Sequence, residues 1–293
     1  MAADAGQTQP DGRGGGSVSP SPAAARRALR LRQGRLEEVA ESVAEERPLV
    51  LYVDGEELAT LVVSPTDLEE LVLGFLASEG VVAGPADVAW TAIDATRGEA
   101  WVTTRTGAGR GARDRLLRHP MITSCCGRAR PTAYFQSDAG LSRLSDPQDG
   151  PFLPVAEAQA LMRELEARTR SSLFGATGGV HSALLARLDG EVLALRSDVG
   201  RHNALDKLYG SGLLRGLDAA VCVIAFSGRI SSEVLLKAAK IGSPILLSKS
   251  APTSFALDLA DELGITTVGF IRDDRLTVYT GAERIVAERS ARP

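Results

Sequence analysis

Three short apolar runs restrict the fold of this 293-residue chain more than any other feature of its sequence. The runs lie at 219–226, 244–248 and 266–271, and amphipathic segments at 234–239 and 255–263 separate them. Continuous apolar runs of this length are typical of strands that are buried on both faces of a sheet. Their alternation with helical segments predicts a β-α-β-α-β unit with parallel strands and right-handed crossovers, and therefore an α/β fold.

A smaller α+β unit is expected before this layer. Asp54-Gly55 separates two apolar runs, a pattern that predicts a β-hairpin with a type I′ turn. Ser64 precedes Pro65 at the start of a helical pattern, so we expect Ser64 to cap that helix. The other elements predicted before residue 219 are strands at 88–94 and 99–104, a helix over 153–173, and a hairpin of 183–188 with 192–196.

The composition along the chain predicts three parts. Residues 1–35 are rich in Gly, Pro, Ala and Ser, which cannot build a core, so we expect a disordered tail. Residues 36–150 are predicted to form the N-terminal α+β domain, which includes a cysteine-bearing loop at 119–131. Residues 151–293 are predicted to form the C-terminal domain with the parallel layer.

Charge and cysteine content exclude several function classes. The formal net charge is −4, only 4% of the residues are aromatic, and no run of 18 apolar residues occurs. We therefore expect neither nucleic acid nor membrane as a partner. Three cysteines are too few for a secreted disulfide framework, and the count fits a protein of the reducing cytoplasm.

Polar clusters follow each of the three apolar runs, at the edge where ligands bind in parallel sheets. Arginine, lysine and helix N-termini at this edge favour a phosphorylated ligand. The same residues could also serve only as turns and helix caps. The candidate binding residues are Ser227, Gly228, Arg229, Lys249, Phe270, Ile271, Arg272, Asp273, Asp274 and Arg275.

A fourth polar segment, residues 198–207, carries charges of both signs together with Arg201 and His202. Such a dense mixture indicates a buried hydrogen-bond network rather than a solvated surface. The network could contact the ligand or only brace the fold, and Arg201 and His202 are included among the candidate binding residues.

The adjacent cysteines Cys125 and Cys126 are the sharpest chemical feature. Arg128 and Arg130 follow them, and positive neighbours lower the pKa of a thiol and so raise its thiolate fraction. A thiolate on a loop can take up a sulfur atom and pass it on by thiol exchange. The pair could equally be incidental or redox-sensitive. Zinc binding is not expected because adjacent cysteines lack the usual ligand spacing, and Cys222, in an apolar run, is expected to be a buried small hydrophobe.

Several long motifs in the same order resemble the formate dehydrogenase accessory sulfurtransferase family, FdhD/NarQ. The resemblance covers about residues 48–285 and is strongest after residue 177. The motifs that carry it are Thr177 to His181, Arg196 to Lys207, Ser227 to Glu233, Ser250 to Ser254, and Gly269 to Tyr279.

The resemblance implies a function and a fold. It implies a sulfurtransferase that receives sulfur from a cysteine desulfurase and passes it to the bis(molybdopterin guanine dinucleotide) cofactor of molybdenum or tungsten. The cofactor is bound as cargo for the formate dehydrogenase apoenzyme, and the protein is expected to be a homodimer without a structural metal. The C-terminal domain is expected to share the three-layer fold of cytidine deaminases without their zinc site, and residues 270–275 to match the cofactor-binding segment.

The resemblance also assigns the sulfur-carrying residue. Aligning residues 124–127 with a Ser-Ser-Cys-Gly version of the family loop places Cys126 at the first family cysteine, the persulfide carrier. The second family cysteine falls on Ala129, so either Cys125 substitutes for it or one thiol suffices. Two alternatives remain: a non-catalytic chaperone that only binds the cofactor, and a nucleotide-processing enzyme on the deaminase-like fold.

Overall fold

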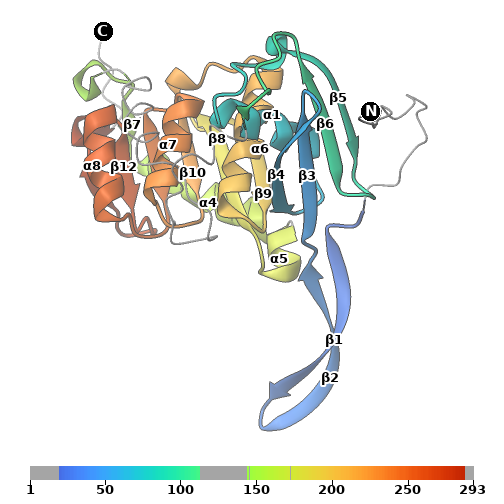
Figure 1. Ribbon diagram of the computed structural model, residues 1–293. Helices are drawn as coiled ribbons and strands as arrows, with labels where there is room; N and C mark the ends of the chain where they lie inside the picture. Colours follow the sequence, from blue (N-terminus) through green and yellow to red (C-terminus); the bar gives the residue numbers. More distant parts are fainter. Residues whose placement is uncertain (1–19, 113–143, 145, 172, 288–293) are drawn as a thin grey trace, which may run out of the picture.

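The computed structural model describes residues 20–112, 144, 146–171 and 173–287. Figure 1 shows two sheets side by side with helices packed between and around them, and a long hairpin that projects from the molecule. None of the helices in these residues is long and apolar enough to cross a membrane.

The N-terminal unit is a four-stranded sheet in the order β4-β3-β6-β5 with helix α1 against it. Asp54 and Gly55 both have positive φ angles, 51° and 87°, as a type I′ turn requires, so the predicted hairpin is confirmed. The two strands predicted at 88–94 and 99–104 are also confirmed. The unit consists of β3 (Arg47–Val53), β4 (Glu56–Val63), α1 (Leu68–Ser78), β5 (Val88–Asp94) and β6 (Glu99–Thr104).

The C-terminal unit is built on a six-stranded sheet in the order β13-β12-β11-β10-β8-β9. Strands β10, β11 and β12 are parallel, which confirms the predicted β-α-β-α-β layer. The elements are β7 (Leu153–Pro154), α4 (Val155–Arg170), α5 (Leu173–Thr177), β8 (His181–Arg187), β9 (Val192–Asp198), α6 (Arg201–Arg215), β10 (Cys222–Phe226), α7 (Ser232–Ile241), β11 (Ile245–Ser248), α8 (Ser254–Leu263), β12 (Thr266–Gly269), β13 (Thr277–Thr280) and β14 (Ile285–Val286).

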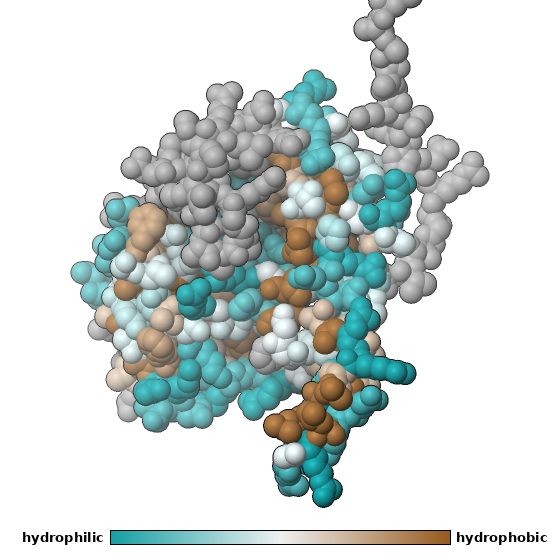
Figure 2. All heavy atoms as spheres, turned by 60° about the horizontal axis from the view of Figure 1, so that its bottom comes forward, coloured by the Kyte–Doolittle hydropathy of each residue, from teal (hydrophilic) through white to brown (hydrophobic). Residues whose placement is uncertain are grey.

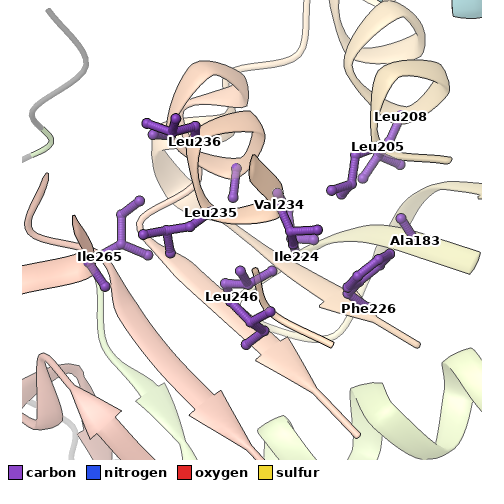
Figure 3. Close-up of a cluster of buried hydrophobic side chains, with 14 of the residues drawn as sticks. Ala183, Leu205, Leu208, Ile224, Phe226, Val234, Leu235, Leu236, Leu246 and Ile265 are labelled. Carbon is purple, nitrogen blue, oxygen red and sulfur yellow. The ribbon is translucent and has the colours of Figure 1, made fainter. Parts of the chain in front are cut away.

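The six-stranded sheet has apolar cores on both faces, because its central strands carry continuous apolar runs. On one face, Ile224, Phe226 and Leu246 pack against helices α6 and α7, as Figure 3 shows. Helix α8 adds buried side chains to the same core. On the other face, Val223 and Leu247 pack against α4. The result is the expected three-layer α/β architecture. Cys222 is 1% exposed in β10, as predicted, and burial raises the pKa of its thiol.

Two sequence predictions are wrong for particular residues. The tail predicted over 1–35 includes β1 (Ala23–Arg32), which pairs with β2 (Arg35–Ala44) in a ten-residue antiparallel register. Each strand of this hairpin gains backbone hydrogen bonds without needing a core, and composition alone does not reveal such pairing.

Ser64 does not cap the following helix. The helix begins at Leu68 after Asp67, whose φ is 50°. The N–H of Ser64 donates instead to the carboxylate of Asp198 at 3.0 Å, and its Oγ accepts from the N–H of Val199 at 3.1 Å. The polar groups of Ser64, which the local sequence pattern predicted to cap the helix, therefore form hydrogen bonds to a distant segment of the chain instead.

Helices α1 and α6 pack backbone to backbone and so join the two units. A Cβ atom placed on Gly210 of α6 would lie 1.9 Å from the carbonyl oxygen of Glu70, and one on Gly74 would lie 1.8 Å from that of Asp206. By contrast, nothing lies within 4 Å of a Cβ placed on Gly212, two residues further along α6.

The Gly210→Ala variant is therefore expected to lower the free energy of unfolding by about 1–3 kcal/mol, because the methyl group forces the two helices apart. Gly212→Ala is the matched control, and it should be neutral or stabilising by up to about 1 kcal/mol through helix propensity. Urea unfolding followed by circular dichroism measures both. Equal free energies for the two variants would contradict the close packing of α1 on α6.

Candidate functional site: a charged groove at the strand ends

Two neighbouring cavities form a groove between α4 and the carboxyl ends of the parallel strands. Their volumes are about 540 and 680 Å³. They share the side chains of Met162, Glu166, Arg170 and Lys249, so one ligand can extend through both. Each volume falls within the usual range for small-molecule sites.

The smaller cavity is lined on one side by the start of β8 and the end of β10. The N–H of Ser182 donates to Ser227 Oγ at 2.9 Å, and the N–H of Ser227 donates to the carbonyl of Ser182 at 3.0 Å. A Cβ on the next residue, Gly228, would lie 2.8 Å from the Phe226 ring and 3.3 Å from His181 Nδ1. The strand end is thus packed too closely for a side chain at position 228.

His181 lines the smaller cavity, and burial lowers the pKa of its imidazole. The positive charges of Arg201 and His202 lower this pKa further, while Asp198 opposes the change. The imidazole is therefore neutral at pH 7 and presents one nitrogen donor and one nitrogen acceptor. This cavity can bind a polar but uncharged part of a ligand.

The larger cavity is densely charged. Glu166 of α4 forms an ion pair with Lys249 at 2.6 Å, and Arg170 lies 3.8 Å from the same carboxylate. The Nη1 of Arg272 donates to the carbonyls of Lys249 at 2.9 Å and Ile271 at 2.7 Å, so this guanidinium is held at the strand ends. Arg163 pairs with Asp273 at 3.5 Å.

Five basic and three acidic side chains line this larger cavity in a chain whose net charge is negative. Guanidinium and ammonium groups gathered at the carboxyl edge of parallel strands suit phosphate oxygens. Carboxylates beside them can accept hydrogen bonds from a base or a sugar. The arrangement fits an elongated phosphorylated ligand, with phosphates in the larger cavity and an uncharged portion in the smaller one.

The structure brings most of the predicted binding residues into this groove. Lys249 lines both cavities and Ser227 the smaller one, and the larger cavity is also lined by Ile271, Arg272, Asp273, Asp274 and Arg275. Five others are not among the described residues that line either cavity, and their part in binding stays a prediction: Phe270, Gly228, Arg229, Arg201 and His202.

These five residues occupy different environments. Phe270 is exposed, with a φ of 51°, and Arg229 is exposed as well. His202 lies 3.0 Å from the carboxylate of Glu233 on α7. Cys125 and Cys126 lie outside the described residues.

The residues of α4 were missed by the sequence analysis as ligand contacts. Gln159, Arg163, Glu166 and Arg170 are spaced four, three and four residues apart and therefore share one face of α4. That polar stripe is visible in the sequence, but any amphipathic helix carries one, and only the tertiary fold places this stripe over the strand ends.

The segment over residues 198–207 mainly braces the fold. Lys207 and Asp198 are both fully buried and lie 2.7 Å apart. The ammonium of Lys207 also donates to the carbonyl of Ser64 at 3.1 Å, and Asn203 donates to Asp198 at 2.9 Å. This network ties β9 and α6 to the N-terminal unit.

Comparisons with known proteins identify the family of this chain. Residues 44–286 match the model of the FdhD/NarQ family, so the chain belongs to that family. It is 48% identical over 257 residues to "Sulfur carrier protein FdhD" of Listeria monocytogenes, covering 87% of this chain and 96% of the relative. The protein of the same name from Geobacillus kaustophilus is 48% identical over 265 residues, covering 90% and 98%.

A solved structure confirms the fold. The crystal structure of a candidate formate dehydrogenase accessory protein from Desulfotalea psychrophila superimposes with a TM-score of 0.72 at 28% identity. The match covers 91% of this chain and all of the other chain. The α/β architecture described above is therefore shared along nearly the whole length.

Proposed function

We propose that this protein is a sulfur carrier that serves the maturation of formate dehydrogenase. In this proposal Cys126 receives sulfur from a cysteine desulfurase. The groove between α4 and the strand ends holds the bis(molybdopterin guanine dinucleotide) cofactor, with molybdenum or tungsten, as cargo. The sulfur then passes to this cargo before the formate dehydrogenase apoenzyme takes it up.

Sulfur loading at Cys126 is a thiol exchange. The Cys126 thiolate attacks the terminal sulfur of the donor's cysteine persulfide. A new S–S bond forms on Cys126, the donor's S–S bond breaks, and the donor cysteine leaves as a thiolate. No external oxidant or reductant is needed, because the transferred sulfur enters and leaves the step in the same oxidation state.

One observation supports the proposal of a dinucleotide cargo: the two adjoining cavities differ in the charge of the side chains that line them. The larger one gathers Lys249, Arg272 and Arg275 for phosphates, and the smaller one presents the neutral imidazole of His181. The relatives named as sulfur carriers support the sulfur-transfer part. The missing second loop cysteine, at Ala129, favours one further candidate, a chaperone that binds the cofactor without carrying sulfur.

Sulfur loading can be tested on the purified wild-type chain. Incubation with a cysteine desulfurase and cysteine should add about 32 Da, the mass of one sulfur atom, which dithiothreitol then removes. Intact-protein mass spectrometry measures the adduct. A chain that takes up no sulfur while its donor becomes loaded would contradict the sulfur-carrier role and favour the non-catalytic chaperone.

Cargo binding can be tested with GDP as the probe. The Lys249→Ala variant should bind GDP about 10–150-fold more weakly, because one charge-assisted hydrogen bond is worth about 1.5–3 kcal/mol. Arg187→Ala is the matched control, since Arg187 pairs with Glu191 at 2.8 Å in another exposed ion pair outside the groove. Isothermal titration calorimetry measures both. Equal affinities for the two variants would place the nucleotide elsewhere.

A further inference from the structure

Glu166 of α4 lies where the two cavities of the groove meet, since its side chain lines both of them. Its Oε1 lies 2.6 Å from the ammonium of Lys249, and its Oε2 lies 3.8 Å from the guanidinium of Arg170. Lys249 and Arg170 also line both cavities. One carboxylate of the chain itself thus lies between two cations that any ligand extending through both cavities would meet.

This ion pair lies at an edge of the molecule that is open to water. Helix α5, at the bottom of Figure 1, leads into β8, whose start pairs with the end of β10. Figure 2 brings that side forward and shows hydrophilic side chains along the lower rim of the body. The side chains of Glu166 and Lys249 are 32% and 40% exposed. Water screens both charges of such a pair, so its partners can separate at small cost when another anion arrives.

Two other cations of the larger cavity are held differently. Arg272 donates to the backbone carbonyls of Lys249 and Ile271, which are neutral and leave its positive charge in place. Arg163 lies 3.5 Å from the carboxylate of Asp273, a side chain that is 85% exposed. Of these three cations, Lys249 therefore has the closest carboxylate partner.

A phosphate and a carboxylate are alternative partners for one ammonium group. Both form charge-assisted hydrogen bonds to it, and two anions beside the same cation repel each other. A phosphate that binds to Lys249 must therefore displace Glu166 or bind against its repulsion, and in both cases its affinity falls. We propose that Glu166 is an internal competitor, which pairs with Lys249 until a phosphate arrives and so weakens the binding of phosphorylated ligands to the groove.

This inference rests on the proposed function and adds a means of release to it. A carrier has to give up its cargo to the apoenzyme, and several phosphates held by five basic side chains would bind tightly. Glu166 keeps the affinity moderate, because its carboxylate can return to Lys249 as a phosphate leaves. The binding of an uncharged ligand should not depend on this competition, since such a ligand does not need the charge of Lys249.

Isothermal titration calorimetry with GDP tests the competition. Glu166→Gln removes the charge but keeps the size and the helix propensity of the side chain, and it should bind GDP about 3–10-fold more tightly than the wild type. Glu164→Gln is the matched control, because Glu164 forms an exposed ion pair with Arg168 at 2.6 Å on the same helix. Glu164 is not among the described residues that line either cavity, so this variant should bind GDP like the wild type.

Guanosine, which carries no phosphate, separates competition from direct contact. The wild type and Glu166→Gln should bind guanosine with equal affinity. Weaker binding of GDP or guanosine to Glu166→Gln would overturn the proposal, since the carboxylate would then accept a hydrogen bond from the base or the sugar. Equal tightening for both probes, or an unchanged affinity for GDP, would overturn it as well.

The Lys249→Ala variant separates this inference from the proposed cargo site. If Lys249→Ala weakens GDP binding while Glu166→Gln does not strengthen it, the cargo site stands and only the competition is overturned. If Lys249→Ala leaves GDP binding unchanged, the phosphates do not meet Lys249, and both the cargo site and the competition are overturned.

Discussion

The Cys126→Ala variant is expected to gain no sulfur from a cysteine desulfurase, whereas Cys125→Ala should gain about 32 Da like the wild type. The physical reason is the position of the neighbouring charges. Cys126 is followed by Gly127 and Arg128, and a nearby guanidinium stabilises the thiolate that attacks the donor sulfur. Intact-protein mass spectrometry of the two variants, loaded side by side, separates the two thiols.

Two further measurements make this result decisive. The Cys126→Ala variant should bind GDP as tightly as the wild type, because the basic side chains proposed to hold the phosphates, Lys249, Arg272 and Arg275, are unchanged in it. It should also fail to support formate dehydrogenase activity in a strain that lacks its own carrier. Full activity with Cys126→Ala would favour the non-catalytic chaperone, and loading that is lost only in Cys125→Ala would move the carrier to Cys125.

The parallel layer could be predicted because its signals are local. Runs such as 219–226 and 244–248 are apolar throughout, as a central strand between two layers of helices requires. The helix predicted over 153–173 shows the limit of such patterns. The structure divides this stretch into β7, α4 and α5, and the buried positions Leu161 and Leu165 follow the predicted helical spacing only within α4.

The hairpin of β1 and β2 and the groove between α4 and the strand ends both depend on contacts between separate segments. A local sequence pattern does not contain such contacts. Residues 23–32 lack a core, and the ten-residue register with 35–44 becomes evident only when both strands are paired. The role of Glu166 likewise follows from the packing of α4 over the strand ends, where its carboxylate meets Lys249. The sequence thus places the strand-end half of the groove, while the tertiary fold supplies the half on α4.

The deaminase-like alternative is separated from the sulfur carrier by its metal requirement. In the part of the chain that the structure describes, no group of three or more His, Cys, Asp or Glu residues is placed to hold a metal ion. The adjacent cysteines Cys125 and Cys126 lack the usual spacing of zinc ligands, so we expect metal analysis of the purified full chain to find no stoichiometric zinc. A zinc ion in each chain would favour the nucleotide-processing enzyme.

The buried ion pair of Lys207 and Asp198 should be the most sensitive point of the fold. Lys207→Met is expected to lower the free energy of unfolding by about 3–5 kcal/mol, because it leaves the Asp198 carboxylate buried without its counter-ion. Both side chains are 0% exposed, so water cannot replace the lost partner. Urea unfolding measures the loss, and amide hydrogen exchange should show faster exchange in β9 and α6.

The double variant Lys207→Met with Asp198→Asn distinguishes the lost charge pair from a simple packing defect. Removing both charges should restore part of the stability, with a coupling free energy of about 1–3 kcal/mol. The exposed ion pair of Arg187 and Glu191 is the matched control. Arg187→Met should lower the free energy of unfolding by no more than about 1 kcal/mol. A Lys207→Met variant as stable as Arg187→Met would mean that Ser64 and Asn203, which also donate to Asp198, hold its carboxylate without the lysine.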